Sequence, residues 1–176
     1  YLKKIYIPES IQDVKAYREA EIAFSWSIKL IKKVIDGLAA GVVLPLTLPI
    51  WAISALIIKR QSPGTVFYRQ SRMGINGKEF YCIKFRSMKL DAEATGAQFA
   101  ARNDTRVFPF GRFMRVTRID ELPQLLNLIR GEISLIGPRP ERAVFIETFV
   151  EEIPYYAQRL LVKPGISGYA QVMYPY

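Results

Sequence analysis

The sequence predicts an α+β fold, in which a membrane-associated helical segment precedes a small domain built around a β-hairpin. Three observations support this. There is an uncharged, mostly apolar run from Leu38 to Ile58, an Asn76-Gly77 pair between two strand-like segments, and helical patterns on both sides of them. The chain has 176 residues, which is enough for one domain of ordinary size.

The composition limits the chemistry that this chain can use. Its net charge of +9 indicates an anionic partner, such as nucleic acid, anionic lipid or a phosphorylated substrate. It has no histidine, so acid–base chemistry would depend on carboxylates, lysine, tyrosine or the single cysteine, Cys82. One cysteine cannot form an internal disulfide, and its apolar surroundings favour a buried structural thiol over a nucleophile.

Residues 10–33 have the pattern of an amphipathic helix that Ser10 could cap. Trp26 and the basic cluster from Lys29 to Lys33 would suit the interface of a bilayer, where indole rings and long basic side chains settle.

The apolar run that follows is long enough to cross a bilayer core, which needs roughly 20 apolar residues. Pro45 and Pro49 should bend or break a helix there, because proline removes a backbone donor and clashes with the preceding turn. Basic residues flank both ends, whereas a spanning helix normally shows this bias at one end. The residues alone leave two alternatives open: a run that enters and leaves by the same face, and one kinked transmembrane helix.

Two strands and a tight turn are predicted next. Thr65–Arg69 and Glu79–Arg86 have strand character, and Asn76-Gly77 between them is a strong hairpin signal because both residues tolerate a positive φ. Phe108–Arg115 then interleaves aromatic residues with arginines. This pattern suits a second membrane-surface contact, a substrate-lining loop or a partly buried connector.

The remaining predicted elements are short, and Tyr155 and Tyr156 among them would suit the membrane interface. They are a helix or loop at Ala92–Ala101, a helix at Pro123–Ile129, a strand at Ile133–Ile136, helices at Glu141–Val150 and Ile153–Leu161, and turns at Lys163–Gly165 and Ser167-Gly168.

Asp120 and Glu121 are the first candidates for a chemical site. They lie just before Pro123, a residue favoured in the first turn of a helix, and a helix N-terminus stabilises an ionised carboxylate or a phosphate. Arg115 and Arg118 add positive charge nearby. An aspartate held in this way can attack phosphorus. The alternative is an ordinary acidic helix cap.

Two further groups of cations suit a phosphate or a diphosphate. Strand alternation would place Lys84 and Arg86 on one face, and the prolines on either side of Arg139 would present its guanidinium with little entropy left to lose. The alternatives are a solvated strand face for the first group and a loop leading into a helix for the second.

Several familiar sites are absent from the sequence. It has no glycine-rich phosphate loop, no dinucleotide fingerprint and no cysteine–histidine metal cluster. The cations do not form a regular stripe with stacking aromatics, which argues against nucleic acid as the partner. Carboxylates together with phosphate oxygens would make a natural Mg²⁺ site.

A string of short motifs runs between Lys32 and Tyr176. They are Ala55–Lys59, Ser62–Gln70, Arg72–Lys78, Lys84–Met88, Asp120–Leu125, Ser134–Glu141 and Lys163–Gln171. Each motif is modest alone, but together and in this order they are specific. They resemble the bacterial sugar transferases, the monotopic polyprenol-phosphate phosphoglycosyl transferases, and Ile153–Tyr156 and Tyr174–Tyr176 resemble the exopolysaccharide-type branch of that family.

The resemblance implies a re-entrant membrane helix, which a Ser-Pro pair commonly breaks in the family. Here the matching pair is Leu48-Pro49, so the break would rest on Pro49 and Pro45, with Thr47 as a substitute hydrogen-bonding group. The implied organisation is an N-terminal amphipathic helix or linker over 1–33, a re-entrant helix over 34–60 and a cytosolic catalytic domain over 61–176 that continues further in the family.

The resemblance also implies a reaction. Asp120 would be the nucleophile that accepts a phosphosugar from a UDP-sugar, and polyprenyl (undecaprenyl) phosphate would then take the phosphosugar to begin exopolysaccharide assembly. Mg²⁺ would assist at Asp120 and Glu121. The site would face the cytoplasm at the bacterial inner membrane, with membrane lipid as a further partner, and homo-oligomerisation is left open. The residues expected at the substrate phosphates are Lys84, Arg86, Arg115, Arg118 and Arg139.

A second hypothesis, from another class, is a non-catalytic membrane-anchored basic module that binds anionic lipid or partner proteins. The net charge of +9 supports both hypotheses equally. The carboxylate pair among arginines and the ordered motifs support the enzyme.

Overall fold

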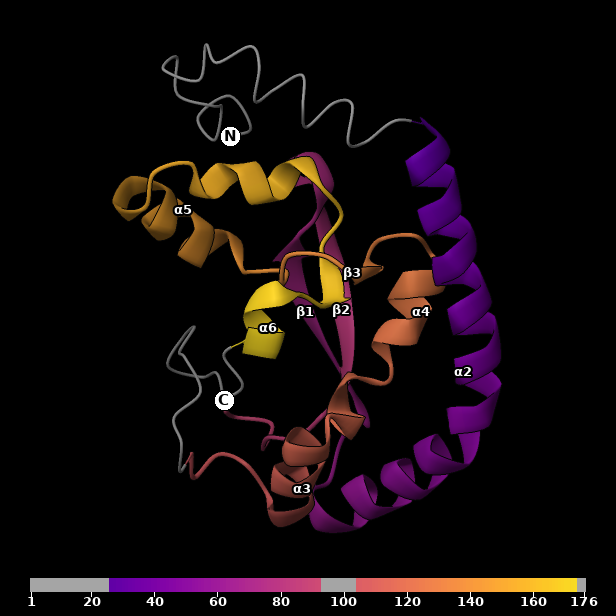
Figure 1. The fold of residues 1–176 in the computed structure, drawn as a ribbon. Helices are drawn as coiled ribbons and strands as arrows, with labels where there is room; N and C mark the ends of the chain where they lie inside the picture. The colour runs from indigo at the N-terminus through magenta and orange to yellow at the C-terminus, as the bar shows by residue number, and fades with distance from the viewer. Residues whose placement is uncertain (1–25, 93–103, 174–176) are drawn as a thin grey trace.

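The computed structural model describes residues 26–92 and 104–173 of the chain. One long helix, α2 (Trp26–Gln61), runs along one side of a domain that contains two small sheets and several short helices (Figure 1). The predicted α+β class is therefore confirmed. The helix or loop expected at 92–101 lies, apart from Ala92, outside the described residues.

The helix α2 has 36 residues and contains both Pro45 and Pro49. It stays helical through the two prolines but bends in its second half (Figure 1), as expected where prolines remove intrahelical hydrogen bonds. The Thr47 hydroxyl donates to the carbonyl of Leu44 at 2.9 Å within this region. Of the helix expected over 10–33, residues 10–25 lie outside the described part, and Trp26–Lys33 are the first turns of α2.

Most of the apolar surface of α2 faces away from the rest of the protein. Among the described residues it is the one helix long and apolar enough to cross a membrane, and only 11% of its most apolar stretch is buried. Leu46 is 72% exposed and Leu38 is 66% exposed. The buried positions are Asp36, Ala40, Ser54 and Ile58. A helix with this exposure is consistent with association with a membrane.

Polar contacts fasten the first half of α2 to the strand β3 (Ser134–Ile136). The Asp36 carboxylate accepts a hydrogen bond from the Ser134 hydroxyl at 2.7 Å and another from the Leu135 backbone N–H at 3.0 Å. One turn earlier, the Lys32 ammonium donates to the carbonyl of Ile136 at 2.6 Å. A buried carboxylate in an apolar helix requires such donors, so these contacts fix where α2 lies on the domain.

The predicted hairpin is present as β1 (Phe67–Met73) paired antiparallel with β2 (Glu79–Phe85). Between the strands, η1 (Ile75–Gly77) makes the turn, and Asn76 and Gly77 both have positive φ, at 55° and 70°. The turn prediction is therefore confirmed. The first strand lies further along the chain than predicted, because the pairing extends to Met73 opposite Glu79.

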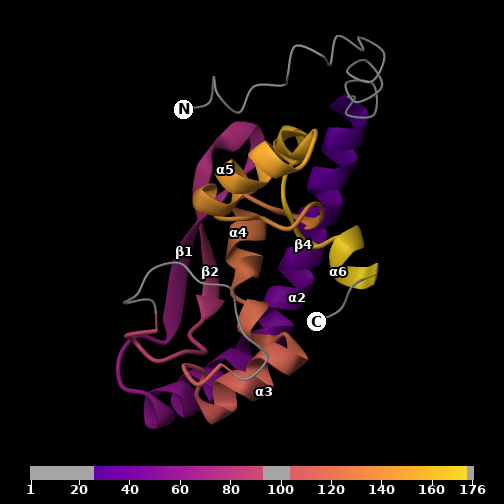
Figure 2. The ribbon, with the colours of Figure 1, turned by 90° about the vertical axis from the view of Figure 1, so that its left-hand side faces the viewer.

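The helix α4 (Gln124–Ile129) lies between the hairpin and α2, as both ribbon views show (Figures 1 and 2). Its Asn127 is fully buried: the side-chain oxygen accepts from the Ile83 N–H at 3.0 Å, and the amide nitrogen donates to the carbonyl of Tyr81 at 2.8 Å. Around it, an apolar cluster joins the three elements: Ala40, Phe80, Cys82, Leu125, Leu128 and Ile133. Burial raises the pKa of the Cys82 thiol, which agrees with a structural role.

The segment that interleaves aromatics with arginines is a helix, α3 (Pro109–Thr117). Its inner side buries Met114, and a Cβ added at Gly111 would clash with the backbone of Ser87, so the helix crosses the chain after β2 at close range. Its outer side exposes Phe113 and Val116 beside the bent half of α2. The segment is therefore a connector whose inner side is buried and whose outer side is exposed.

The remaining elements build a second, parallel sheet and its surroundings. They are η2 (Ile119–Glu121), α5 (Ala143–Glu152), η3 (Tyr156–Leu161), β4 (Gly165–Ser167) and α6 (Tyr169–Met173). The sequence predicts turns where β4 forms, and its pattern does not predict α6. β4 pairs in parallel with β3, and Gly137 and Gly165 allow their backbones to meet, since a Cβ at either would clash with the other.

The two tyrosines proposed for the membrane interface differ in their exposure and packing. Tyr155 is 52% exposed. Tyr156 instead packs on the ring of Phe149, with 5.1 Å between ring centroids, and on the guanidinium of Arg159. Tyr156 is thus held within the domain.

Candidate active site

The carboxylate pair lies in η2, the single turn that connects α3 to α4. Arg118 ends α3 with a φ of 60°, and this left-handed residue turns the chain into η2. Neither carboxylate caps α4, whose N-cap is Pro123 without a side-chain hydrogen bond. The pair therefore lies just before the helix, as expected from its place before Pro123, but it lies in a 3₁₀ turn and does not cap the helix.

Asp120 is 7% exposed, and its Oδ1 is buried with no hydrogen-bond partner among the described residues. A buried carboxylate oxygen without a donor is rare in folded proteins, because its desolvation is not compensated. Such an atom indicates a position where a ligand, a metal ion or a reacting group completes the site.

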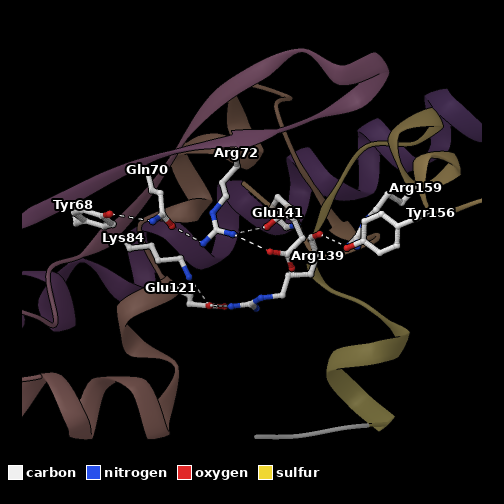
Figure 3. A network of polar contacts seen from close by, with 10 residues as sticks. Tyr68, Gln70, Arg72, Lys84, Glu121, Arg139, Glu141, Tyr156 and Arg159 are labelled. Atoms are coloured by element: carbon white, nitrogen blue, oxygen red, sulfur yellow. Dashed lines mark hydrogen bonds and ion pairs between the residues drawn. The ribbon is translucent and has the colours of Figure 1, made fainter. Parts of the chain in front are cut away.

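Glu121 is surrounded by cations from two other parts of the chain. Its Oε1 accepts from the Lys84 ammonium of β2 at 2.8 Å and lies 3.5 Å from Nη2 of Arg139, in the loop after β3 (Figure 3). Three segments far apart in sequence therefore meet at one carboxylate oxygen. The predicted grouping of Lys84 and Arg139 near the carboxylate pair is present in the structure.

The two carboxyl groups are shifted in opposite directions. Burial raises the pKa of Asp120 above its usual value, although Lys84, Arg115 and Arg118 oppose the shift. Burial also raises the pKa of Glu121, but Lys84 and Arg139 outweigh it, so that the net pKa of Glu121 is lowered. Adjacent carboxyl groups with opposed shifts can serve different roles, one as a fixed charge and one as a reacting group.

Arg115 and Arg118 flank the pair on α3 and at its C-terminus. The Nε of Arg115 donates to the Ser87 hydroxyl at 2.9 Å, and its charge acts on Asp120. Arg118 is exposed, and it lowers the pKa of both carboxyl groups. Both arginines are thus electrostatically coupled to the site.

Arg86 has different neighbours from Lys84. The strand β2 ends at Phe85, so strand alternation does not extend to Arg86. Its guanidinium is buried, donating to the Ser62 hydroxyl at 2.9 Å and carbonyl at 2.5 Å, while its Nε donates to the Thr65 carbonyl at 2.6 Å. These hydrogen bonds stabilise the turn between α2 and β1. They are not contacts with the carboxylate pair.

A chain of polar contacts extends the site beyond the predicted residues (Figure 3). Along one face of β1, Gln70 donates to the Tyr68 hydroxyl, and Arg72 donates to Gln70 and pairs with Glu141. These side chains were not predicted from the sequence as part of the site. The period of two in β1, together with the pairing of Tyr68 opposite Lys84, is the signal that could have found them.

The donor set for a metal ion is small. Among residues 26–92 and 104–173, no three histidine, cysteine, aspartate or glutamate side chains form a group that could hold a metal ion by itself. Mg²⁺ is commonly held by one or two carboxylates together with substrate phosphates. The free oxygen of Asp120 beside Glu121 fits a site of that kind, completed by phosphate oxygens.

Comparison with known proteins identifies the family of this chain. A sequence model of the family described as bacterial sugar transferase matches residues 27–176. The chain belongs to the bacterial sugar transferase family. The match covers α2 except for its first residue, and it covers the whole candidate site.

Three proteins that are named for an activity are similar to the chain. It is 48% identical over 146 residues to the UDP-N-acetylgalactosamine-undecaprenyl-phosphate N-acetylgalactosaminephosphotransferase of Aeromonas hydrophila, covering 83% of this chain and 34% of that protein. Proteins named UDP-glucose:undecaprenyl-phosphate glucose-1-phosphate transferase are 45% identical in Xanthomonas campestris pv. campestris and 41% identical in Caulobacter vibrioides. These two matches cover 78% and 83% of this chain, and 28% and 55% of the relatives. The chain thus spans about a quarter to a half of the length of these sugar transferases.

Proposed function

We propose that this chain carries the active site of a phosphoglycosyl transferase, which moves a phosphosugar from a UDP-sugar to undecaprenyl phosphate. The observation that carries the proposal is the buried, unpartnered oxygen of Asp120 next to Glu121, which is held by Lys84 and Arg139. The names of the three relatives support the reaction class, since each contains undecaprenyl phosphate and a phosphosugar transfer.

In the first step, Asp120 attacks the phosphorus that bears the sugar. A bond forms between a carboxylate oxygen and this phosphorus, the bond to the bridging oxygen breaks, and UMP leaves with the electron pair. In the second step, an oxygen of undecaprenyl phosphate attacks the same phosphorus and releases Asp120. The product is undecaprenyl diphosphosugar, the starting lipid for exopolysaccharide assembly.

Each neighbour of the carboxylate pair has a role in this scheme. Burial leaves the ionised Asp120 poorly solvated, which favours its reaction with a phosphorus. Glu121 keeps Lys84 and Arg139 in place as a fixed negative charge, and these cations compensate for the charge of the diphosphate. Arg115 and Arg118 add to the positive field at Asp120.

Asp120 and Glu121 would also hold Mg²⁺ together with diphosphate oxygens. When bound, Mg²⁺ would neutralise charge on the phosphates and on UMP as it leaves.

We further propose that α2 is re-entrant and that the site faces the cytoplasm at the bacterial inner membrane. Basic residues flank the apolar run at both ends, and the bend near Pro45 and Pro49 suits a helix that enters one leaflet and returns. Labelling of single cysteines at both ends of α2 from one side of sealed vesicles tests this. Labelling of the two ends from opposite sides would instead establish a kinked transmembrane helix.

The function is tested by measuring nucleotide release. The purified protein, with a panel of UDP-sugars, is expected to release UMP over many turnovers only when undecaprenyl phosphate and Mg²⁺ are both present. Without the lipid, release should stop at one equivalent of UMP per protein, because Asp120 then stays occupied. The panel also identifies the sugar, since the relatives are named for different ones. Release of UDP would indicate a conventional glycosyltransferase. Membrane binding without any nucleotide release would favour the non-catalytic basic module.

A further inference from the structure

The loop that carries Arg139 is unusually well anchored through its backbone. It runs from Gly137 to Glu141, between β3 and α5, and its four carbonyls from Pro138 to Glu141 each accept a hydrogen bond from a different residue. The donors, in order, are the Gly165 N–H at 2.9 Å, Arg159 Nη2 at 2.6 Å, Arg72 Nη1 at 3.0 Å and the Met73 N–H at 2.9 Å. The N–H of Gly137 donates to the carbonyl of Ser167 at 2.9 Å.

Two of these four donors are side chains, and both are guanidinium groups. Bonds from a charged donor are stronger than backbone bonds between neutral groups. Arg159 donates to the carbonyl of Arg139 itself, whereas Arg72 also pairs with Glu141. Arg159 is therefore the side chain that acts directly on the peptide unit of the site arginine.

Arg159 is itself held rigidly. Its guanidinium carbon lies 4.5 Å from the ring centroid of Tyr156, and it donates to the hydroxyl of that tyrosine. The same ring packs on Phe149 of α5. Arg159 thus has few alternative rotamers. Through its contacts with Tyr156 and with the Arg139 carbonyl, it fixes the loop relative to η3 and α5.

The contact that the loop supports is sensitive to small displacements. Nη2 of Arg139 lies 3.5 Å from Oε1 of Glu121, at the long limit of a hydrogen bond. Arg159 approaches the loop from the side away from Glu121 (Figure 3). A shift of the Arg139 backbone would therefore separate the guanidinium from the carboxylate pair, although Arg159 does not touch that pair.

We propose that Arg159 is a positioning residue for Arg139: by holding the Arg139 carbonyl, it places the Arg139 guanidinium at Glu121 and at the substrate diphosphate. This inference rests on the proposed function for its effect on catalysis. The backbone anchoring can be tested without it.

The first experiment measures the backbone hydrogen bonds of the loop, by hydrogen–deuterium exchange in the full chain. The reporters are the amides of Gly137 and Gly165, which donate to the carbonyls of Ser167 and Pro138. In Arg159→Gln these amides are expected to exchange faster than in the wild type, while amides of the β1–β2 hairpin keep their rates. Arg159→Lys retains one donor but not the planar stacking group, so it should give an intermediate rate. Arg130→Gln removes the same charge from an exposed position and is the control. Unchanged exchange at both amides in Arg159→Gln would overturn the proposal.

The second experiment is a double-mutant cycle on UMP release. Arg159→Gln alone is expected to lower kcat/KM for the UDP-sugar by about 10-fold or more, as found when supporting residues of a site are removed. In an Arg139→Lys background, the same change should cost much less, because the group that Arg159 positions is already altered. Equal losses in both backgrounds would show a general structural role and overturn the proposal. If the wild type releases no UMP with any UDP-sugar, the proposed function fails, and the exchange experiment still decides whether Arg159 anchors the loop.

Discussion

The helix α2 and the segment from Ile119 to Ile129 both bury polar side chains, but they differ in where their large apolar side chains lie. In α2, most leucines and isoleucines are exposed, and the buried positions are Asp36, Ala40, Ser54 and Ile58. In the second segment, the polar Asp120 and Asn127 are buried together with Leu125 and Leu128. The second segment lies at the edge of the apolar core and carries the candidate nucleophile, Asp120. The first is arranged for an apolar solvent on its outer side, with polar groups turned towards the protein.

The largest expected effect comes from removing the reacting group in the second segment. Asp120→Asn keeps the shape of the side chain but cannot form the covalent phosphosugar intermediate. UMP release should fall by a factor on the order of 10³ or more, and labelling of the protein with a phosphosugar should disappear. Asp91→Asn, at an exposed aspartate, is the control. Substantial turnover by Asp120→Asn would contradict the covalent mechanism.

A charge on the outer side of α2 should weaken membrane association. Leu46→Lys places an ammonium at a position that is 72% exposed, at a cost of about 2.5–3.5 kcal/mol if the residue lies near the bilayer centre. Flotation with lipid vesicles measures the effect. Leu90→Lys changes a leucine that is 66% exposed outside α2 and is the matched control. Equal losses for the two variants would indicate that α2 is not the membrane-contacting element.

The inner side of α2 should instead respond in stability. Asp36→Ala leaves the Ser134 hydroxyl and the Leu135 N–H without their acceptor, which should lower the free energy of unfolding by about 1.5–3 kcal/mol. Thermal unfolding in detergent measures this. Leu46→Ala, on the exposed side of the same helix, should change stability much less. A similar loss for both would mean that the helix packs on the domain differently.

The smallest expected effect is a shift in pH dependence. The proposed mechanism needs ionised Asp120, whose pKa burial raises above its usual value, so activity should rise as the pH increases through that raised pKa. Arg115 lowers the pKa of Asp120, and Arg115→Gln should therefore move the acid limb of single-turnover UMP release to higher pH. Arg112→Gln, exposed on the same helix, should leave the limb in place. A limb that stays in place or moves to lower pH in Arg115→Gln would show that Arg115 does not stabilise the ionised nucleophile.

Short sequence patterns predicted the elements that depend on interactions between neighbouring residues, such as the hairpin turn. The Asn76-Gly77 turn needs only two residues with positive φ, and the sequence shows both. The strand β4 has three residues, and it forms because β3 is beside it, a long-range pairing that no local pattern reveals. For the same reason, α3 was described from its composition as a surface, loop or connector, whereas it is the packing of Met114 and Gly111 that fixes it as a helix.

Charged residues within motifs were enough to predict part of the candidate site. Lys84, Glu121 and Arg139 were singled out, and they meet in the structure. Arg86 was grouped with Lys84 by alternation, which fails because β2 stops one residue before it. Arg159 carried no sequence signal of its own, because its target is a backbone carbonyl.

The buried amide of Asn127 has a consequence for how the β1–β2 sheet ends. Its oxygen and nitrogen bind the Ile83 N–H and the Tyr81 carbonyl, the donor and acceptor that a third strand would use at that edge. A side chain from α4 thus substitutes for a strand and occupies groups through which another chain could pair. The outer edge of β2 is therefore covered by a helix at Tyr81 and Ile83. Another strand cannot pair with the sheet at these two residues.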